Sequence, residues 1–159
     1  MKLVTLTPAY DGDMARLIRR SLKAHGLDIP GTAYFDESLD HLSEYYLAEP
    51  GKRAYYVLLD DDGSLAGGVG LAEFPLLDGC AELQKLYLDD RVKGHGLGYR
   101  LIERVEAAAR SLGYRRVYLE THTNLAAAMH IYAKAGYAEI PKPEAVVHAT
   151  MNRFYLKAL

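Results

Sequence analysis

The chain has 159 residues, of which half are apolar and a quarter charged, and this composition is typical of one globular domain that we expect to span residues 1–159. The formal net charge of −2 excludes a general attraction to nucleic acid or to an anionic membrane. No apolar stretch approaches the ~20 residues that a transmembrane helix requires. The single cysteine, Cys80, cannot form an internal disulfide, so we expect a cytoplasmic protein.

The N-terminal third predicts one strand and two helices. Residues 2–7 favour a short strand that a proline ends. Asp11 is the predicted N-cap of the first helix, and Gly26 is its expected end. After a long loop, Asp36 is predicted to cap a second helix that ends before Pro50. The apolar positions with helical spacing are Met14, Leu17, Ile18, Leu22, Leu39, Leu42 and Tyr46.

The middle of the chain predicts three strands in succession, which indicates an antiparallel meander. These strands cover residues 54–59, 65–72 and 81–88, and turn sequences separate them. The acidic run at 60–62 belongs to the first turn. It lacks an ordered set of further oxygen ligands, so we expect a solvated turn there and no metal site.

The region after residue 96 predicts a strand–helix–strand unit. Apolar residues at helical spacing indicate a helix from Leu97 to Leu112, and Gly113 is its expected end. A short strand covers residues 116–120. Because a helix connects the two strands, we expect residues 83–88 and 117–120 to be parallel neighbours joined by a right-handed crossover.

The C-terminal region predicts one more helix and two closing strands. Asn124 is the expected N-cap of this helix, and Gly136 ends it. The strands cover residues 137–140 and 150–156. One face of the helix carries Leu125, Ala128, Met129 and Tyr132.

A glycine-rich stretch, residues 89–100, joins the third strand of the meander to the helix at Leu97. Glycines at alternate positions, Gly94, Gly96 and Gly98, allow left-handed backbone conformations and a close approach of the backbone to a ligand. Successive amides at a helix N-terminus favour phosphate. A glycine-rich helix start without a ligand is the alternative, and spacing alone leaves both interpretations open.

Two segments resemble the signatures of the GNAT superfamily of acyl-CoA-dependent N-acyltransferases. Residues 89–98 are similar to its pyrophosphate loop, Gln/Arg-x-x-Gly-x-Gly/Ala. The pattern fits from Arg91 and also from Lys93, and we prefer Lys93 because that register starts the helix at Leu97 or Gly98. Residues 124–137 are similar to the second signature, Asn-x-x-Ala-x-x-x-Tyr-x-Lys-x-Gly-Phe.

The resemblance implies an α/β (α+β) fold with a mainly antiparallel sheet of six to seven strands, helices on both faces and a central parallel pair that splays. It also implies acetyl-CoA as cosubstrate. The pyrophosphate would be held by the loop residues Lys93, Gly94, His95, Gly96, Leu97 and Gly98. The pantetheine arm would pair with the backbone of Leu86, Tyr87 and Leu88, and Asn124 of the second signature would also contact the coenzyme.

Two catalytic residues follow from the resemblance. The spacing of Tyr132 on an apolar helix face is that of a packed core residue, but Tyr132 matches the signature tyrosine that protonates the departing thiolate, and the resemblance therefore favours the catalytic role. Glu82 lies on the strand where several members place a general base, and a solvated strand charge is the alternative. The six histidines show no metal-ligand spacing, so no metal site is expected.

The implied reaction is transfer of an acetyl group from acetyl-CoA to a primary amine of a small molecule or amino acid by direct attack on the thioester. A protein or peptide amine is an alternative acceptor, and a catalytically silent acyl-CoA-binding module is an alternative function. The acceptor is expected between the first two helices, the loop at 30–34 and the chain from His148 to Phe154. Many members of the family are dimers, so the resemblance also allows a homodimer.

Overall fold

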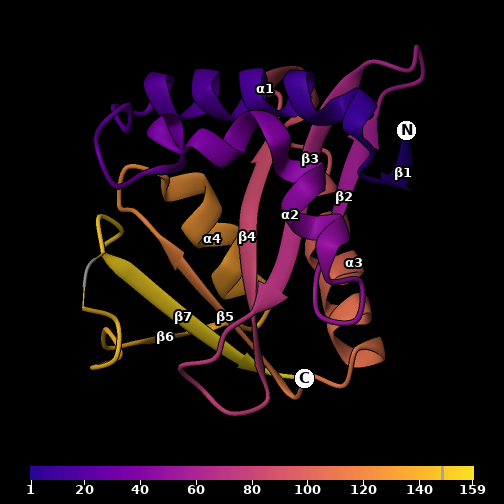
Figure 1. Ribbon diagram of the computed structural model, residues 1–159. Helices are drawn as coiled ribbons and strands as arrows, with labels where there is room; N and C mark the ends of the chain where they lie inside the picture. Colours follow the sequence, from indigo (N-terminus) through magenta and orange to yellow (C-terminus); the bar gives the residue numbers. More distant parts are fainter. Residues whose placement is uncertain (148) are drawn as a thin grey trace.

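The computed structural model describes residues 1–147 and 149–159, which form one twisted sheet with helices on both faces (Figure 1). The strands are β1 (Lys2–Thr5), β2 (Ala54–Leu59), β3 (Leu65–Glu73), β4 (Cys80–Leu88), β5 (Arg116–Thr121), β6 (Ala138–Ile140) and β7 (Arg153–Ala158). The α-helices are α1 (Asp11–Ala24), α2 (Leu42–Ala48), α3 (Leu97–Ser111) and α4 (Ala126–Lys134). Short 3₁₀ segments cover Pro8–Tyr10, Ala33–Phe35, Glu37–His41 and Asp90–Val92.

The strand order in the sheet is β1-β2-β3-β4-β5-β7-β6. Every described pair is antiparallel except β4 and β5, which are parallel and are connected by α3. The predicted meander corresponds to β2, β3 and β4, and the strand–helix–strand unit to β4, α3 and β5. The expected fold class is therefore confirmed.

The parallel pair holds together at one end only. The paired residues run from Cys80↔Arg116 to Glu82↔Tyr118, and no described residue of β4 beyond Glu82 pairs with β5. Figure 1 shows β5 diverging from β4 away from this shared end. The expected pairing of residues 83–88 with 117–120 was thus wrong in its position. A wedge opens where that pairing was predicted.

A bulge in β4 lies at the start of this wedge. The register with β3 moves from Gly70↔Gln84 to Gly68↔Tyr87, so β4 has two residues opposite one residue of β3. Lys85, within the bulge, has φ +49. A bulge bends its strand and increases the local twist, so this one turns the second half of β4 away from β5.

Two apolar clusters cover the two faces of the sheet. One joins α3 residues such as Leu101 and Val105 to Val69 of β3, and it includes Tyr132 of α4. The other joins α1 and α2 to Tyr55 and neighbouring residues of β2. Figure 1 shows α1 and α2 in front of the sheet and α3 behind it. The helical spacing of the apolar residues correctly predicted which faces of α1 and α3 are buried against the sheet.

Two predicted helix caps were wrong. Asp11 is the first residue of α1, and its carboxylate accepts hydrogen bonds from the amide of Ser43, at 2.9 Å, and from its hydroxyl, at 2.5 Å. It therefore joins α1 to α2 and accepts from the first turn of α2, and not from its own helix. The N-cap of α4 is Leu125, whereas Asn124 Nδ2 donates to the His25 carbonyl at 3.0 Å. In both cases a tertiary partner replaces the local cap.

The second predicted helix is divided into two segments. Asp36 is a cap, as expected, but of the 3₁₀ segment Glu37–His41, where its carboxylate accepts from the Ser38 amide at 3.0 Å. α2 follows directly. Within the described residues, no helix is long and apolar enough to span a bilayer.

Candidate active site

The glycine-rich loop leads from β4 into α3 through two left-handed residues. Asp89 caps the 3₁₀ segment Asp90–Val92 by accepting from the Arg91 amide at 3.0 Å. Gly94 then has φ +82 and Gly96, the N-cap of α3, has φ +72. A side chain at either position would be strained even though open space surrounds both.

Gly98 is required for a different reason. A Cβ at this position would come within 2.9 Å of Ile131 Cδ1 on α4. The absent side chain therefore allows α3 and α4 to approach each other beside the loop. Because α3 begins at Leu97, the structure agrees with the register that starts the signature at Lys93.

The loop amides are available to a ligand. Within residues 1–147 and 149–159, the amides of residues 94–99 donate to no protein acceptor. The amide of Lys93 donates to the Asp90 carbonyl at 3.4 Å. The N-terminal turn of a 15-residue helix carries partial positive charge, so these unpaired donors form a site suited to an anion.

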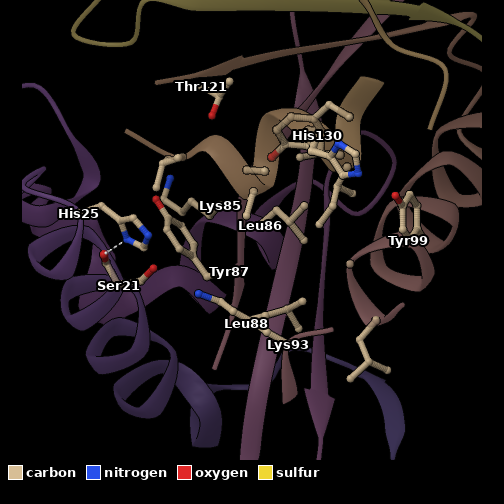
Figure 2. A pocket seen from close by; sticks show the side chains of 18 of the residues that line it. Ser21, His25, Lys85, Leu86, Tyr87, Leu88, Lys93, Tyr99, Thr121 and His130 are labelled. Atoms are coloured by element: carbon tan, nitrogen blue, oxygen red, sulfur yellow. Dashed lines mark hydrogen bonds between the residues drawn. The ribbon is translucent and has the colours of Figure 1, made fainter. Parts of the chain in front are cut away.

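A cavity of about 360 Å³ extends from this loop into the wedge between β4 and β5. Figure 2 shows His25, which directly follows α1, on one side and Tyr99 of α3 on the other, with Leu86, Tyr87 and Leu88 of β4 between them. The predicted site residues that line it are Leu86, Tyr87, Leu88, Lys93, Gly94, Gly96, Leu97, Gly98 and Tyr132. His95, Asn124 and Glu82 do not line it.

These three residues have other surroundings. The His95 ring nitrogen Nδ1 lies 3.3 Å from the Val92 carbonyl, within the loop. Asn124 connects the start of α4 to the end of α1, as described above. Glu82 lines a second cavity, of about 630 Å³.

Tyr132 both packs in the core and lines the first cavity. Only 5% of its surface is exposed, and its ring lies 6.1 Å from those of Tyr137 and Tyr155. Burial raises the pKa of the Tyr132 hydroxyl above its ordinary value, so the group remains protonated. A protonated hydroxyl in an apolar wall can donate a proton to an anion that forms beside it.

A hydrogen-bonded chain orients Glu82. Tyr46 of α2 donates to Gln84 Oε1 at 2.7 Å, and Gln84 Nε2 donates to Glu82 Oε2 at 3.0 Å. Burial raises the pKa of Glu82, the bond from Gln84 lowers it, and the nearby charge of Glu120 raises it again. The net effect is a carboxylate that holds its proton to higher pH than a solvated one.

Two tyrosines reach the bulge by crossing β3 at its glycines. The Tyr55 hydroxyl donates to the Lys85 carbonyl at 2.9 Å. A Cβ at Gly70 would lie 2.7 Å from both the Tyr46 hydroxyl and the Tyr55 ring. Glycine in β3 therefore leaves room for the side chains that support β4 beside the wedge.

Sequence reasoning missed several residues that line the first cavity, among them His25, Lys85 and Glu120. Glu120 ends the strand predicted beside the glycine loop, and this position was a usable signal because ligands gather at the carboxyl ends of parallel strands. His25 directly follows α1, in a part of the chain without a motif. His148, named in the expected acceptor region, lies outside the described residues.

Comparisons with known proteins agree with this geometry. The model of the acetyltransferase (GNAT) family matches residues 20–137. An uncharacterised N-acetyltransferase of Escherichia coli, YjgM, is 36% identical over 132 residues, which cover 80% of this chain and 75% of that protein. An IAA acetyltransferase of Azospirillum brasilense is 29% identical over 109 residues, which cover 69% of each chain.

Solved structures share the fold at lower identity. A GNAT-family acetyltransferase of Staphylococcus aureus superposes with a TM-score of 0.86 at 18% identity, over 99% of this chain and 98% of the other. The PaiA N-acetyltransferase of Thermoplasma acidophilum, solved with coenzyme A, superposes with a TM-score of 0.76 at 16% identity, over the whole of both chains. Together with the family match over most of its length, these findings show that the chain belongs to the GNAT family of acetyltransferases.

Proposed function

We propose that this protein transfers an acetyl group from acetyl-CoA to a primary amine of a small molecule or amino acid, and that the amine attacks the thioester directly. The observation that carries the proposal is the row of unpaired amides at residues 94–98 beside the wedge between β4 and β5. A diphosphate and a thin peptide-like arm are the two parts of coenzyme A that such a loop and wedge would accept.

The coenzyme would be held mainly by backbone groups. The loop from Lys93 to Gly98 would bind the pyrophosphate, with charge-assisted hydrogen bonds of ~1.5–3 kcal/mol each. Lys93 also lines the cavity and would add a positive charge, although its ammonium now pairs with Asp90 at 2.5 Å. The strand segment Leu86–Leu88, which has no β5 partner, would pair with the pantetheine arm.

Glu82 is proposed as the general base. Acetyl transfer requires a neutral amine, and a carboxylate whose pKa is raised toward the working pH accepts a proton more effectively than an ordinary one. Glu82 lines the second cavity and is held by Gln84, so a proton could reach it directly or through one water.

Tyr132 is proposed as the general acid. The departing thiolate of coenzyme A, with an ordinary pKa of ~8.5, would form in an apolar cavity that raises its affinity for a proton. Tyr132 lines that cavity and stays protonated because it is buried. The residue returns to its starting state by taking up a proton from solvent after coenzyme release.

The location is proposed to be the cytoplasm. Cys80 is buried and unpaired, and burial raises the pKa of its thiol to about 11. A protonated, packed thiol is stable in a reducing compartment.

The test is amine-dependent thiol release from acetyl-CoA by the purified protein. We expect acetyl-CoA binding by calorimetry, no binding of ATP or NAD, and thiol release when small primary amines are added. Binding without turnover on any small amine or peptide would instead identify an acyl-CoA-binding module. Turnover on peptides alone would assign the alternative acceptor, and failure to bind acetyl-CoA would contradict the proposal.

A further inference from the structure

We propose that the acceptor is a primary amine on an apolar arm, with no carboxylate beside the amine, and that its ammonium binds to Glu120 in the second cavity. This inference rests on the proposed function and names the class of substrate. It concerns the cavity of about 630 Å³ that Glu82 lines. Two features support it: the residue types in the wall of this second cavity, and its position next to the first cavity, where the coenzyme is proposed to bind.

The walls of the second cavity are apolar over most of their extent. They come from the loop after β3, from the adjoining parts of β4 and β5, and from residues 145–147. Two of the apolar residues are largely exposed, Leu76 at 48% and Val147 at 72%. The apolar lining residues are Phe74, Pro75, Leu76, Ala145, Val146 and Val147. An apolar arm would cover them and remove their surface from water.

The polar part of the wall is entirely acidic. Glu73, Glu82 and Glu120 line the cavity, and no lysine or arginine is among the described lining residues. Glu73 is already neutralised, because the Arg53 guanidinium donates to both of its carboxylate oxygens at 2.5–3.1 Å.

The other two carboxylates have only neutral hydrogen-bond partners. Glu82 accepts from the Gln84 amide at 3.0 Å, and Glu120 accepts from the Tyr118 hydroxyl at 2.8 Å. Within the described part of the chain, neither forms an ion pair. Burial and the charge of Glu120 raise the pKa of Glu82 by more than the Gln84 bond and the Lys85 charge lower it. The two partly buried carboxylates therefore repel each other, and a ligand that brings an ammonium group relieves an existing cost.

Glu120 connects the two cavities. It is the one described residue that lines both, and it lies at the end of β5 where that strand has diverged from β4. An ammonium bound to Glu120 is therefore held at the wall of the cavity that would contain the thioester. Glu82, on the acceptor side, could then remove the proton from the amine.

The same walls disfavour a free amino acid. In an amino acid the α-carboxylate is attached to the carbon that carries the amine. An amine bound at Glu120 would therefore bring this carboxylate close to Glu82 and Glu120. With no described cation in the wall, that charge would be desolvated without compensation. The cavity therefore discriminates between an amine and the corresponding amino acid by charge more than by shape.

The experiment compares three acceptors of similar size: phenethylamine, L-phenylalaninamide and L-phenylalanine. Assays are run at pH 8, where ordinary histidine side chains are neutral and supply no cation. We expect kcat/KM for phenethylamine and for the amide to exceed that for L-phenylalanine at least tenfold. Equal or better use of L-phenylalanine would overturn the inference and leave the proposed acetyl transfer intact. Thiol release with none of the amines tested would contradict the proposed function itself.

A variant pair assigns the effect to Glu120. Glu120→Gln is expected to raise KM for phenethylamine at least tenfold and to reduce the preference over L-phenylalanine. Glu103→Gln, an exposed site on α3 outside both cavities, is the matched control and should change neither. An unchanged KM and unchanged preference in Glu120→Gln would overturn the role. If that variant unfolds, Glu120→Asp is measured in its place, and the comparison of acceptors with the unaltered protein remains decisive.

Discussion

The two cavities of this protein are built from different parts of the chain, and they differ in what the sequence reveals. The cavity proposed for the coenzyme has one wall made by a continuous stretch, in which Gly94, Gly96 and Gly98 lie among unpaired backbone amides. The cavity proposed for the acceptor is lined by single side chains from β3, β4, β5 and a C-terminal loop. A loop that binds a ligand through its backbone amides requires glycines at fixed spacing, and this spacing is visible in the sequence. A wall made of side chains from separate elements produces no such sequence motif.

The largest expected effect is on the chemistry of the coenzyme cavity. Tyr132→Phe should lower kcat by about 10²-fold or more, because a positioned general acid contributes ~10²–10⁴-fold, while acetyl-CoA affinity is unchanged. Single-turnover kinetics and calorimetry measure the two quantities. Tyr137→Phe is the matched control, since it removes a hydroxyl from the same aromatic cluster outside the cavity. An unaltered kcat in Tyr132→Phe would remove this residue from the mechanism.

The second prediction separates backbone strain from ligand binding. Gly96→Ala should weaken acetyl-CoA binding about tenfold, because the φ of +72 becomes strained and the amides turn away from the ligand. Its free energy of unfolding should also fall by about 1 kcal/mol. Gly63→Ala, in a hairpin turn at φ +84, should lose similar stability with no change in coenzyme affinity. Equal coenzyme affinity in both variants would show that the loop does not bind the pyrophosphate.

The third prediction concerns pH and the acceptor side. The Gln84 amide lowers the pKa of Glu82, so Gln84→Leu should raise that pKa and move the acidic limb of the kcat/KM profile to higher pH. Activity would fall more at pH 6 than at pH 8. Glu82→Gln should remove the limb altogether. A profile that keeps its acidic limb in Glu82→Gln would assign the base to another group or to water.

The smallest effect is expected for the ion pair at the edge of the acceptor cavity. Arg53 lowers the pKa of Glu73, so this pair contributes stability above the ordinary pKa of that carboxyl and loses it as the pH falls through the lowered value. Arg53→Met should reduce the free energy of unfolding by about 1 kcal/mol at pH 7 and by less at pH 3. Chemical denaturation at the two pH values measures the difference. A reduction of the same size at both would exclude the ion pair as its cause.

Most of the elements and the glycine-rich wall of the first cavity could be predicted from the sequence because their signals are local. Gly26 and Gly113 end their helices as expected, with φ +69 and +86. The caps at Asp11 and Asn124 could not be predicted, because Ser43 and the His25 carbonyl compete for these side chains from distant elements. The position of the parallel pairing was predicted wrongly because the bulge falls at Lys85. Lysine rarely adopts a positive φ, so the sequence does not indicate a bulge there.

The second cavity was invisible for the same reason. Of its carboxylates, Glu73 and Glu82 come from the two strands of one hairpin and Glu120 comes from β5, and only Glu82 was a candidate site residue. Only the sheet order brings them to one wall. The expected acceptor region comprised the first two helices, the loop at 30–34 and residues 148–154. None of its described residues lines this cavity, whose C-terminal wall comes from residues 145–147.

The glycines of β3 have a consequence beyond their own strand. Gly68 and Gly70 leave a bare stretch of backbone over which the rings of Tyr46 and Tyr55 extend to hold Gln84 and Lys85. One methyl group added at residue 70 would displace both rings at once, because each lies within 2.8 Å of the new carbon. Two glycines that line neither cavity thus help to set the position of β4 beside the wedge, through the tyrosines that pack over them.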